Sequence, residues 1–117
     1  MKPVDSGGDS PFVVLSTCGS AEEARKLADV LVDELLAACV NVVPQVESVY
    51  RWQGKVERAS EWLLMIKTTA AKLPALQSRL KELHSYELPE CVAFRADAGS
   101  EEYLGWIAES VKRSPHE

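Results

Sequence analysis

The sequence predicts one compact α+β domain. Short strand-like runs alternate with amphipathic helical stripes, and two long strand-like arms meet at one glycine-containing connector. The chain has 117 residues, enough for one hydrophobic core, and its hydrophobic fraction of 46% is ordinary for a folded globular protein. We expect the domain to cover residues 12–112, with loose polar tails at 1–11 and 113–117.

The first two predicted elements are a strand and a helix. Residues 12–17 form a β-branched run that ends before Gly19, which predicts a strand. Ser20 followed three residues later by Glu23 is the pattern of a capping box and predicts a helix start. Apolar side chains then recur at helical spacing, at Ala24, Leu27, Ala28, Leu31 and Leu35. This stripe predicts an amphipathic helix.

The middle of the chain predicts a long hairpin. Residues 39–52 and 55–68 form its arms, and the connector between them contains Gly54, which can take the positive φ of a tight turn. Pro44 cannot donate to a neighbouring strand, so we expect a bulge or bend there. Residues 62–66, WLLMI, do not alternate in polarity, which predicts burial on both faces.

The last third predicts a helix, a strand and a final helix. The second helical stripe consists of Leu73, Leu76, Leu80 and Leu83, with Pro74 in its first turn. Residues 91–95 predict a fourth strand, and residues 101–112 predict a helix capped by Ser100. The resulting order, β-α-β-β-α-β plus a terminal helix, is that of a ferredoxin-like sandwich with its helices on one face of an antiparallel sheet.

The two hairpin arms are too long for the rest of one chain to cover. A usual strand has about 5–6 residues, whereas at about 3.3 Å per residue each unbent arm here spans roughly 45 Å. The first helix, of about 17 residues at about 1.5 Å each, covers only about 25 Å. Because an isolated two-stranded ribbon is marginal in water, we expect another subunit to meet it. The alternative is that the ribbon curls over its own sheet.

Composition excludes several classes of function. The net charge of −5 disfavours a nucleic-acid partner, because an acidic surface repels phosphate backbones. No apolar run approaches the roughly 20 residues that cross a bilayer, and the polar N-terminus lacks a signal-peptide core. We therefore expect no membrane partner and a cytoplasmic location. The three cysteines form no Cys-x-x-Cys pair, so neither a zinc site nor a disulfide framework is predicted.

The sequence also predicts that the protein is not an enzyme. It contains no glycine-rich phosphate loop and no nucleophile elbow, and His84 is the one histidine of the predicted domain. A pair of Cys91 with His84 is the remaining catalytic arrangement. Cys91, however, begins a predicted buried strand, where a thiol is usually inert.

Residues 84–90, HSYELPE, form the first candidate site. The ring of His84, with the carboxylate of Glu87 or Glu90, offers nitrogen and oxygen ligands to a divalent metal ion. Copper(II) stands at the top of the divalent affinity series and is the first candidate. The alternative is that His84 ends the helix as its C-cap, where a partly positive ring suits the negative end of the helix dipole.

The second candidate set lies on the predicted hairpin and consists of Tyr50, Trp52, Lys55, Glu61 and Lys67. If the hairpin meets the 84–90 segment, including Tyr86, at a subunit interface, these side chains line a cleft of the kind that binds small ligands. Lys67 closes an apolar run and needs a partner such as a glutamate. The alternative is that Tyr50 and Trp52 pack an interface and that Lys67 forms a structural ion pair.

Four segments carry a resemblance to a known family. They are LAACVNVVPQVESVYRWQGKVE (36–57), EWLLMIKTT (61–69), HSYELPE (84–90) and YLGWI (103–107). In order and spacing they resemble the CutA-type divalent-cation tolerance family, over nearly the whole predicted domain. Ser85 and Arg95 depart from the pattern, because the family commonly has proline at both positions.

The resemblance implies a PII-like homotrimer of ferredoxin-like subunits, interlocked through their hairpins, in the cytoplasm and linked to copper tolerance. It carries metal-binding roles over to His84 and Glu90. In some bacterial members a first-strand cysteine is implicated in metal binding; Ser16 stands at that position, and Cys18, two residues on, is the candidate here. The alternative role is a PII-like signalling protein or scaffold that binds a small anionic effector in the intersubunit cleft.

Overall fold

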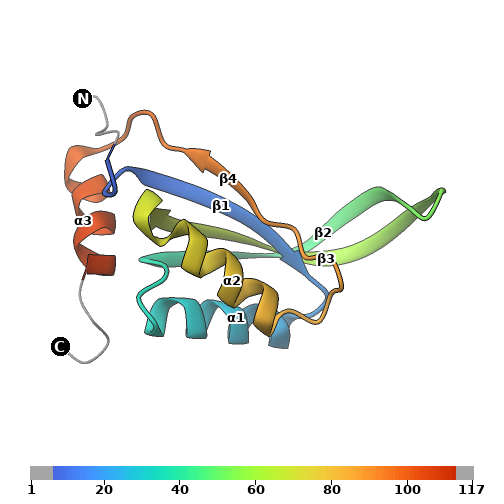
Figure 1. Ribbon diagram of the computed structural model, residues 1–117. Coiled ribbons are helices and arrows are strands. Elements are labelled where there is room, and N and C mark those ends of the chain that lie inside the picture. The colour runs from blue at the N-terminus through green and yellow to red at the C-terminus, as the bar shows by residue number, and fades with distance from the viewer. Residues whose placement is uncertain (1–6, 113–117) are drawn as a thin grey trace.

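The structure is a computed structural model that describes residues 7–112 (Figure 1). In chain order its elements are β1 (Pro11–Cys18), α1 (Ala21–Asp33), β2 (Cys39–Trp52), β3 (Lys55–Thr69), a 3-10 turn η1 (Ala70–Lys72), α2 (Leu73–Leu83), β4 (Val92–Arg95) and α3 (Glu101–Lys112). The predicted order of strands and helices is confirmed. Residues 1–6 and 113–117, which include most of the two predicted tails, lie outside the described residues.

The four strands form one antiparallel sheet in the order β2-β3-β1-β4. α1 and α2 lie side by side on one face of the sheet, and α3 stands at the end opposite the hairpin tip (Figure 1). The core lies between the sheet and these two helices, where Val14, Leu27, Leu64, Ile66 and Leu80 are at most 1% exposed. The sheet keeps two open edges, β2 and β4.

The N-terminal boundary of the ordered domain lies before residue 12. Pro11 already belongs to β1, and Ser10 is fully buried. The backbone N–H groups of Ala70 and Ala71 donate to the carbonyl oxygens of Ser10 and Gly8, at 2.9 and 3.0 Å. Residues 8–11, which the sequence assigns to the tail, are therefore tied to the start of η1.

α1 begins as predicted and ends earlier than predicted. The Ser20 hydroxyl accepts a hydrogen bond from the Glu23 N–H at 3.1 Å, so the N-cap is confirmed. The helix ends at Asp33, because Leu35 takes a left-handed φ of 59°. The N–H of Ala37 then donates back to the carbonyl of Leu31 at 3.1 Å. Leu35 therefore leaves the helical stripe.

The hairpin turn and the bulge lie where the sequence places them. Gln53 and Gly54 have φ values of 49° and 80°, and positive φ at both central residues is characteristic of the type I′ turn that matches the twist of paired strands. The register of β2 against β3 shifts between Val43 and Val46, and Gln45 within this shift has a φ of 56°. The predicted irregularity at Pro44 is therefore a β-bulge.

The outer half of the hairpin is a two-stranded ribbon. β1 pairs with β3 from Thr69 to Trp62, whereas from Glu61 to Lys55 β2 is the one strand within residues 7–112 that pairs with β3. The ribbon projects past the helices and past β1 and β4 (Figure 1). This arrangement confirms the predicted overhang within a single chain, so the ribbon does not curl over its own sheet.

The central stretch of β3 is buried on one face rather than on both. Leu64 and Ile66 are fully buried beneath the helices, whereas Leu63 and Met65 are only half-buried. The prediction for residues 62–66 is therefore wrong for a single chain, since Leu63 and Met65 keep part of their surface exposed on the second face.

The face of the sheet opposite α1 and α2, which we call the open face, is largely apolar. Directly paired residues on neighbouring strands share a face. The register pairs Leu15 with Met65 and Val92, and it pairs Val13 with Phe94. Val92 and Phe94 are 47% and 55% exposed. Every residue of β4 is exposed, so the expectation that Cys91 begins a buried strand is also wrong.

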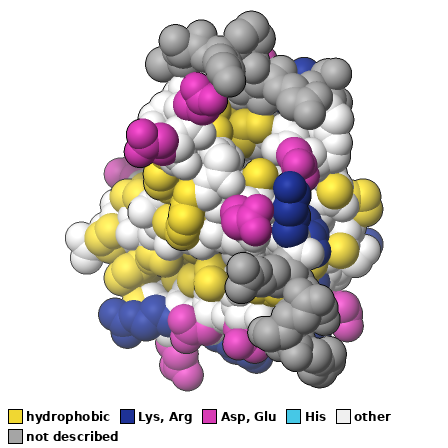
Figure 2. All heavy atoms as spheres, turned by 90° about the vertical axis from the view of Figure 1, so that its left-hand side faces the viewer, with side chains coloured by type: hydrophobic (Ala, Val, Ile, Leu, Met, Phe, Trp, Pro, Cys, Tyr) yellow, Lys and Arg dark blue, Asp and Glu magenta, His cyan; other side chains and the backbone are white. Residues whose placement is uncertain are grey.

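α3 carries an exposed aromatic pair. Ser100 caps the helix as predicted, because its hydroxyl accepts from the Tyr103 N–H at 3.3 Å. The rings of Tyr103 and Trp106 lie 5.5 Å apart between centroids and are 44% and 46% exposed. Figure 2, which views this end, shows hydrophobic side chains exposed among charged ones. None of the helices within residues 7–112 has the length and hydrophobicity of a membrane-spanning segment.

Candidate functional site

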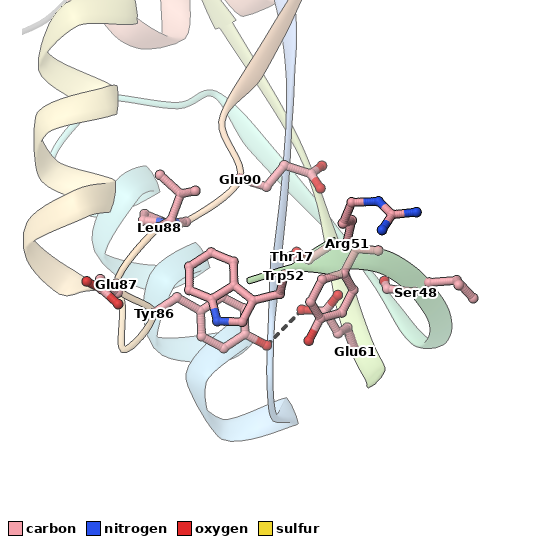
Figure 3. Close-up of a pocket in the computed structure, with 12 residues that line it drawn as sticks. Thr17, Ser48, Arg51, Trp52, Glu61, Tyr86, Glu87, Leu88 and Glu90 are labelled. Atoms are coloured by element: carbon pink, nitrogen blue, oxygen red, sulfur yellow. Dashed lines mark hydrogen bonds between the residues drawn. The ribbon is translucent and has the colours of Figure 1, made fainter. Parts of the chain in front are cut away.

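A groove of about 680 Å³ lies between the ribbon and the 84–90 segment (Figure 3). We call it the hairpin groove. Its lining residues are Thr17, Ser48, Val49, Tyr50, Arg51, Trp52, Glu61, Tyr86, Glu87, Leu88, Pro89 and Glu90. They come from the end of β1, from both arms of the hairpin and from the segment that follows α2.

The Tyr86–Glu61 contact joins the two walls of the groove. The Tyr86 hydroxyl donates to Glu61 Oε2 at 2.7 Å (Figure 3), and Glu61 is only 6% exposed. Burial and the adjacent Glu61 carboxylate raise the pKa of the Tyr86 phenol well above its usual range. Tyr86 therefore stays protonated and remains a donor at physiological pH.

His84 fastens the 84–90 segment to β1. Its side chain is fully buried, and Nε2 lies 2.7 Å from the Thr17 carbonyl oxygen. The Tyr86 N–H donates to Nδ1 at 3.1 Å. These partners fit a neutral ring with its proton on Nε2, because Nε2 then donates while Nδ1 accepts. Both ring nitrogens are therefore in use, and the His84 backbone N–H also closes α2 through Leu80 at 3.0 Å.

Glu23, at the start of α1, fastens the same segment from another side. Its carboxylate accepts from the Ser85 N–H at 2.9 Å and from the Ser85 hydroxyl at 3.0 Å. Desolvation works to raise the pKa of Glu23, but the two hydrogen bonds from Ser85 outweigh it and hold that pKa below its ordinary value. Sequence reasoning assigned Glu23 to the helix cap and missed this link, which joins residues far apart in the chain.

The predicted metal ligands do not meet in one place. His84 presents no free ring nitrogen. It is the C-cap residue of α2 through its backbone N–H, but its ring bonds the Thr17 carbonyl and the Tyr86 N–H instead of facing the end of the helix as a positive charge. Cys18 is fully buried, its Sγ donates to the Ser20 carbonyl at 3.5 Å, and burial raises the pKa of the thiol. Glu87 and Glu90 are exposed and line the groove. Among the described residues, no three His, Cys, Asp or Glu side chains form a group that could hold a metal ion.

The predicted cleft residues divide into two sets. Tyr50, Trp52, Glu61 and Tyr86 line the hairpin groove together. Lys55 pairs with Trp52 beside the turn, outside the lining.

Lys67 lies far along β3, opposite Cys39. Its Nζ donates to the side-chain oxygen of Asn41. The expected glutamate partner of Lys67 is therefore replaced by an amide, and Lys67 takes no part in the groove.

Arg51 is the charged lining residue that sequence reasoning missed. Alternation along β2 assigns it to the side of the strand opposite Tyr50 and Trp52, but the twisted ribbon brings all three to the groove. It is the single basic side chain in this lining, which also contains three glutamates.

The comparison with known proteins agrees with this architecture. The family described as CutA1 divalent ion tolerance protein matches residues 12–110. The chain belongs to the CutA1 family. Among CutA relatives, the divalent-cation tolerance protein CutA of Thermus thermophilus is 51% identical over 99 residues, which are 85% of this chain and 96% of the relative.

Plant and mammalian CutA proteins are also similar but longer. The chloroplastic protein CutA of Arabidopsis thaliana is 45% identical, and protein CutA of Homo sapiens is 42% identical. The matches cover 86% and 84% of this chain. The chain spans 56% of the length of each of these two relatives.

Solved CutA structures have the same fold. CutA from Xylella fastidiosa superposes with a TM-score of 0.86 at 43% identity, covering 88% of this chain and 99% of that one. The Thermus thermophilus divalent cation tolerance protein superposes with a TM-score of 0.84 at 50% identity, covering 86% and 97%. The CutA-type resemblance and the ferredoxin-like prediction are both confirmed.

Proposed function

We propose that this CutA1-family chain acts in divalent-cation tolerance as a homotrimer that binds divalent metal ions, copper first. The observation that carries the proposal is the position of Glu87 and Glu90: both carboxylates are exposed in a groove walled by a ribbon that lacks cover in its own chain. A neighbouring subunit would cover the ribbon and bring further donor atoms to these carboxylates.

Two features support the assembly. The open edges β2 and β4 lie on opposite sides of one sheet, so a contact between β2 of one copy and β4 of the next is head-to-tail. Head-to-tail contacts generate a ring where the rotation between copies closes. The apolar open face offers Val13, Leu15 and Phe94 as surface to bury against the other copies. A ring of three agrees with the family resemblance.

The oligomeric state tests the assembly. Sedimentation of the wild-type chain is expected to give three times the mass of one chain. Phe94→Glu places a charge at the open face and is expected to shift the population to monomer, since an unpaired buried charge is costly. Val32→Glu is the matched control, because Val32 is 39% exposed on α1, in the helical layer. A stable wild-type monomer would remove this part of the proposal.

Copper titration tests the metal site. We expect Glu87→Gln/Glu90→Gln to weaken copper binding by about ten-fold or more, because two oxygen donors lose their charge. His84→Gln is expected to keep the wild-type affinity, since His84 is buried with both nitrogens paired. All proteins carry His116→Gln, so that the histidine at position 116 supplies no imidazole.

The control for general acidity is Glu22→Gln/Glu82→Gln, which removes two exposed helix carboxylates outside the groove. Equal copper affinity in wild type and in Glu87→Gln/Glu90→Gln would exclude the groove as the metal site. Growth at inhibitory copper concentrations, in cells lacking their own CutA1-family protein and complemented with the same variants, tests tolerance itself.

A small anionic effector in the groove is the second candidate function. Arg51 is the feature that favours it, because a guanidinium can hold a carboxylate or phosphate in bidentate fashion. Three glutamates in the same lining oppose it. We rank this function below metal binding for that reason.

We also infer a binding role rather than a catalytic one. Burial and the adjacent Glu90 raise the pKa of the Cys91 thiol. His84, the proposed base of a Cys–His pair, has both ring nitrogens occupied. A thiol of raised pKa with no free base beside it is a poor nucleophile.

A further inference from the structure

The open face carries an ammonium group among apolar side chains. Directly paired residues share a face, and the register places two rows of such residues side by side across the four strands. One row consists of Cys39, Lys67, Val13 and Phe94, and the next consists of Asn41, Met65, Leu15 and Val92. We call them the open-face rows. Lys67 is their one basic residue, and neither row contains a carboxylate.

The polar groups around Lys67 have more hydrogen-bond donors than acceptors. Lys67 Nζ and Cys39 Sγ both donate to Asn41 Oδ1, the thiol at 4.0 Å. Within residues 7–112, no carboxylate forms an ion pair with Lys67, and no group accepts from the amide nitrogen of Asn41. The other N–H groups of the ammonium and those of the Asn41 amide are therefore left to donate to a ligand.

The proposed homotrimer makes this surplus of donors more costly. In that assembly the open face packs against other copies, and Lys67 is already half-buried in a single chain. A neighbouring open face brings the same two rows, and so a second Lys67 rather than a carboxylate. An ammonium that is enclosed without a counter-charge is strongly destabilising, so the assembled rows require an anion.

We propose that the open-face rows bind a small inorganic oxyanion, phosphate or an ion of the same shape, between copies of the chain. Lys67 Nζ and the Asn41 amide N–H groups of the copies donate to its oxygens. The inference rests on the proposed homotrimer. The residues that hold the anion are not those of the hairpin groove, so it does not depend on the metal site.

The experiment measures phosphate binding and oligomeric state together. Inorganic phosphate is titrated into the full chain by calorimetry, in metal-free buffer of constant ionic strength, and sedimentation gives the mass in the same buffer. Lys67→Met is expected to weaken phosphate binding about ten-fold or more, because the charged donor is lost. Its unbranched apolar side chain still fills the open face, so the trimer is expected to persist.

Lys67→Arg is the conservative variant. A guanidinium keeps the charge and holds an oxyanion in bidentate fashion, so phosphate affinity is expected to stay within about three-fold of the wild type. A purely structural role for the lysine stem would not separate Lys67→Met from Lys67→Arg in this way.

Asn41→Asp tests the same site from the opposite direction. It places a carboxylate beside Lys67 and so supplies the counter-charge within the chain. Phosphate binding is expected to be lost, while the trimer is expected to remain.

The matched control is Lys81→Met, which removes an exposed ammonium from α2, in the helical layer. It is expected to bind phosphate as the wild type does. Equal affinity in wild type and Lys67→Met, or an equal loss in Lys67→Met and Lys81→Met, would overturn the inference.

A wild-type trimer that binds no phosphate would also overturn the inference, because Lys67 would then take its counter-charge from another copy. A wild-type monomer would remove the proposed assembly and this site with it. Copper titration of Lys67→Met is expected to give the wild-type affinity, since Lys67 lies outside the hairpin groove. Failure of the anion site and failure of the metal site are therefore measured separately.

Discussion

The Tyr86 hydroxyl donates a 2.7 Å hydrogen bond to Glu61, and this contact closes the hairpin groove at its base. Tyr86 belongs to the segment that follows α2, whereas Glu61 lies on β3 just beyond the last pair with β1. The bond therefore ties the helical layer to the root of the projecting ribbon. It also gives a nearly buried carboxylate the partner that it requires.

Tyr86→Phe is expected to lower the free energy of unfolding by about 1–3 kcal/mol, because it leaves the buried Glu61 carboxylate without this donor. Urea unfolding at one fixed protein concentration measures the change. Tyr50→Phe, in an exposed side chain of the same groove, is expected to change stability by less than about 0.5 kcal/mol. In a Glu61→Gln background, Tyr86→Phe should lower the free energy of unfolding by less than it does in the wild type. An equal decrease in both backgrounds would contradict the proposed coupling between Tyr86 and Glu61.

Ser16→Ala is expected to stabilise the chain by about 1 kcal/mol. Ser16 is fully buried, and its hydroxyl has no hydrogen-bond partner within residues 7–112. Thr68→Val is the contrasting variant, since the Thr68 hydroxyl donates to the Leu36 carbonyl at 2.7 Å. Thr68→Val is expected to lower the free energy of unfolding by about 1 kcal/mol. Thermal unfolding measures both changes in stability. If both variants raised or both lowered the stability, the distinction between an unpaired Ser16 hydroxyl and a hydrogen-bonded Thr68 hydroxyl would be refuted.

The stabilising effect of Glu23 is expected to depend on pH. The bonds from Ser85 hold the folded-state pKa of Glu23 below its unfolded value, so the charged carboxylate stabilises the fold above that unfolded value, about 4.3. The difference in unfolding free energy between wild type and Glu23→Gln should therefore be largest near neutral pH. It should shrink as the pH falls through the folded-state pKa.

Denaturant unfolding at a series of pH values from neutral to acid measures this difference. Glu22→Gln changes the exposed neighbour in the same first turn of α1 and controls for the helix dipole. A difference for Glu23→Gln that grows on acidification would show that the link to Ser85 does not act through the charged carboxylate.

Arg79→Lys is expected to lower the free energy of unfolding at low salt, and to lower it less at high salt, where the ion pair is screened. Arg79 makes two bonds of 2.9 Å to the Glu34 carboxylate and so joins α2 to the end of α1, and a lysine cannot reproduce this bidentate geometry. Arg58→Lys is the control, because Arg58 makes a single exposed contact of 3.2 Å to Glu47. Equal effects of the two variants would contradict the role of the bidentate geometry.

The sequence predicted the strands and helices well, because local chemistry decides most of them. Gly54 and Pro44 mark the turn and the bulge through their own backbone constraints, and Ser20 caps α1 through a bond to a residue in its first turn. The end of α1 was not predictable in this way. Leu35 takes a left-handed backbone conformation that residues other than glycine rarely adopt, and nothing in the local sequence pattern predicts a helix end there.

The candidate site was predicted only in part, because its contacts join distant segments. The sequence predicts metal binding for both His84 and Glu90. In the structure, however, Nε2 of His84 is bonded to the carbonyl oxygen of Thr17, a residue 67 positions away in the chain. Lys67 bonds Asn41 because β2 pairs with β3, a choice that depends on register. Arg51 reaches the groove through the twist of the ribbon, which alternation along a flat strand does not describe.

Within residues 7–112 no third strand pairs with the outer ribbon, and this has a practical consequence. In a lone chain, the backbone amides of this ribbon would exchange with deuterium sooner than those of the four-stranded part of the sheet, because only two strands protect each other there. Peptides from residues 46–61 thus report whether neighbouring copies have docked. Mass spectrometry of their deuterium uptake at high and low concentration follows association without any label.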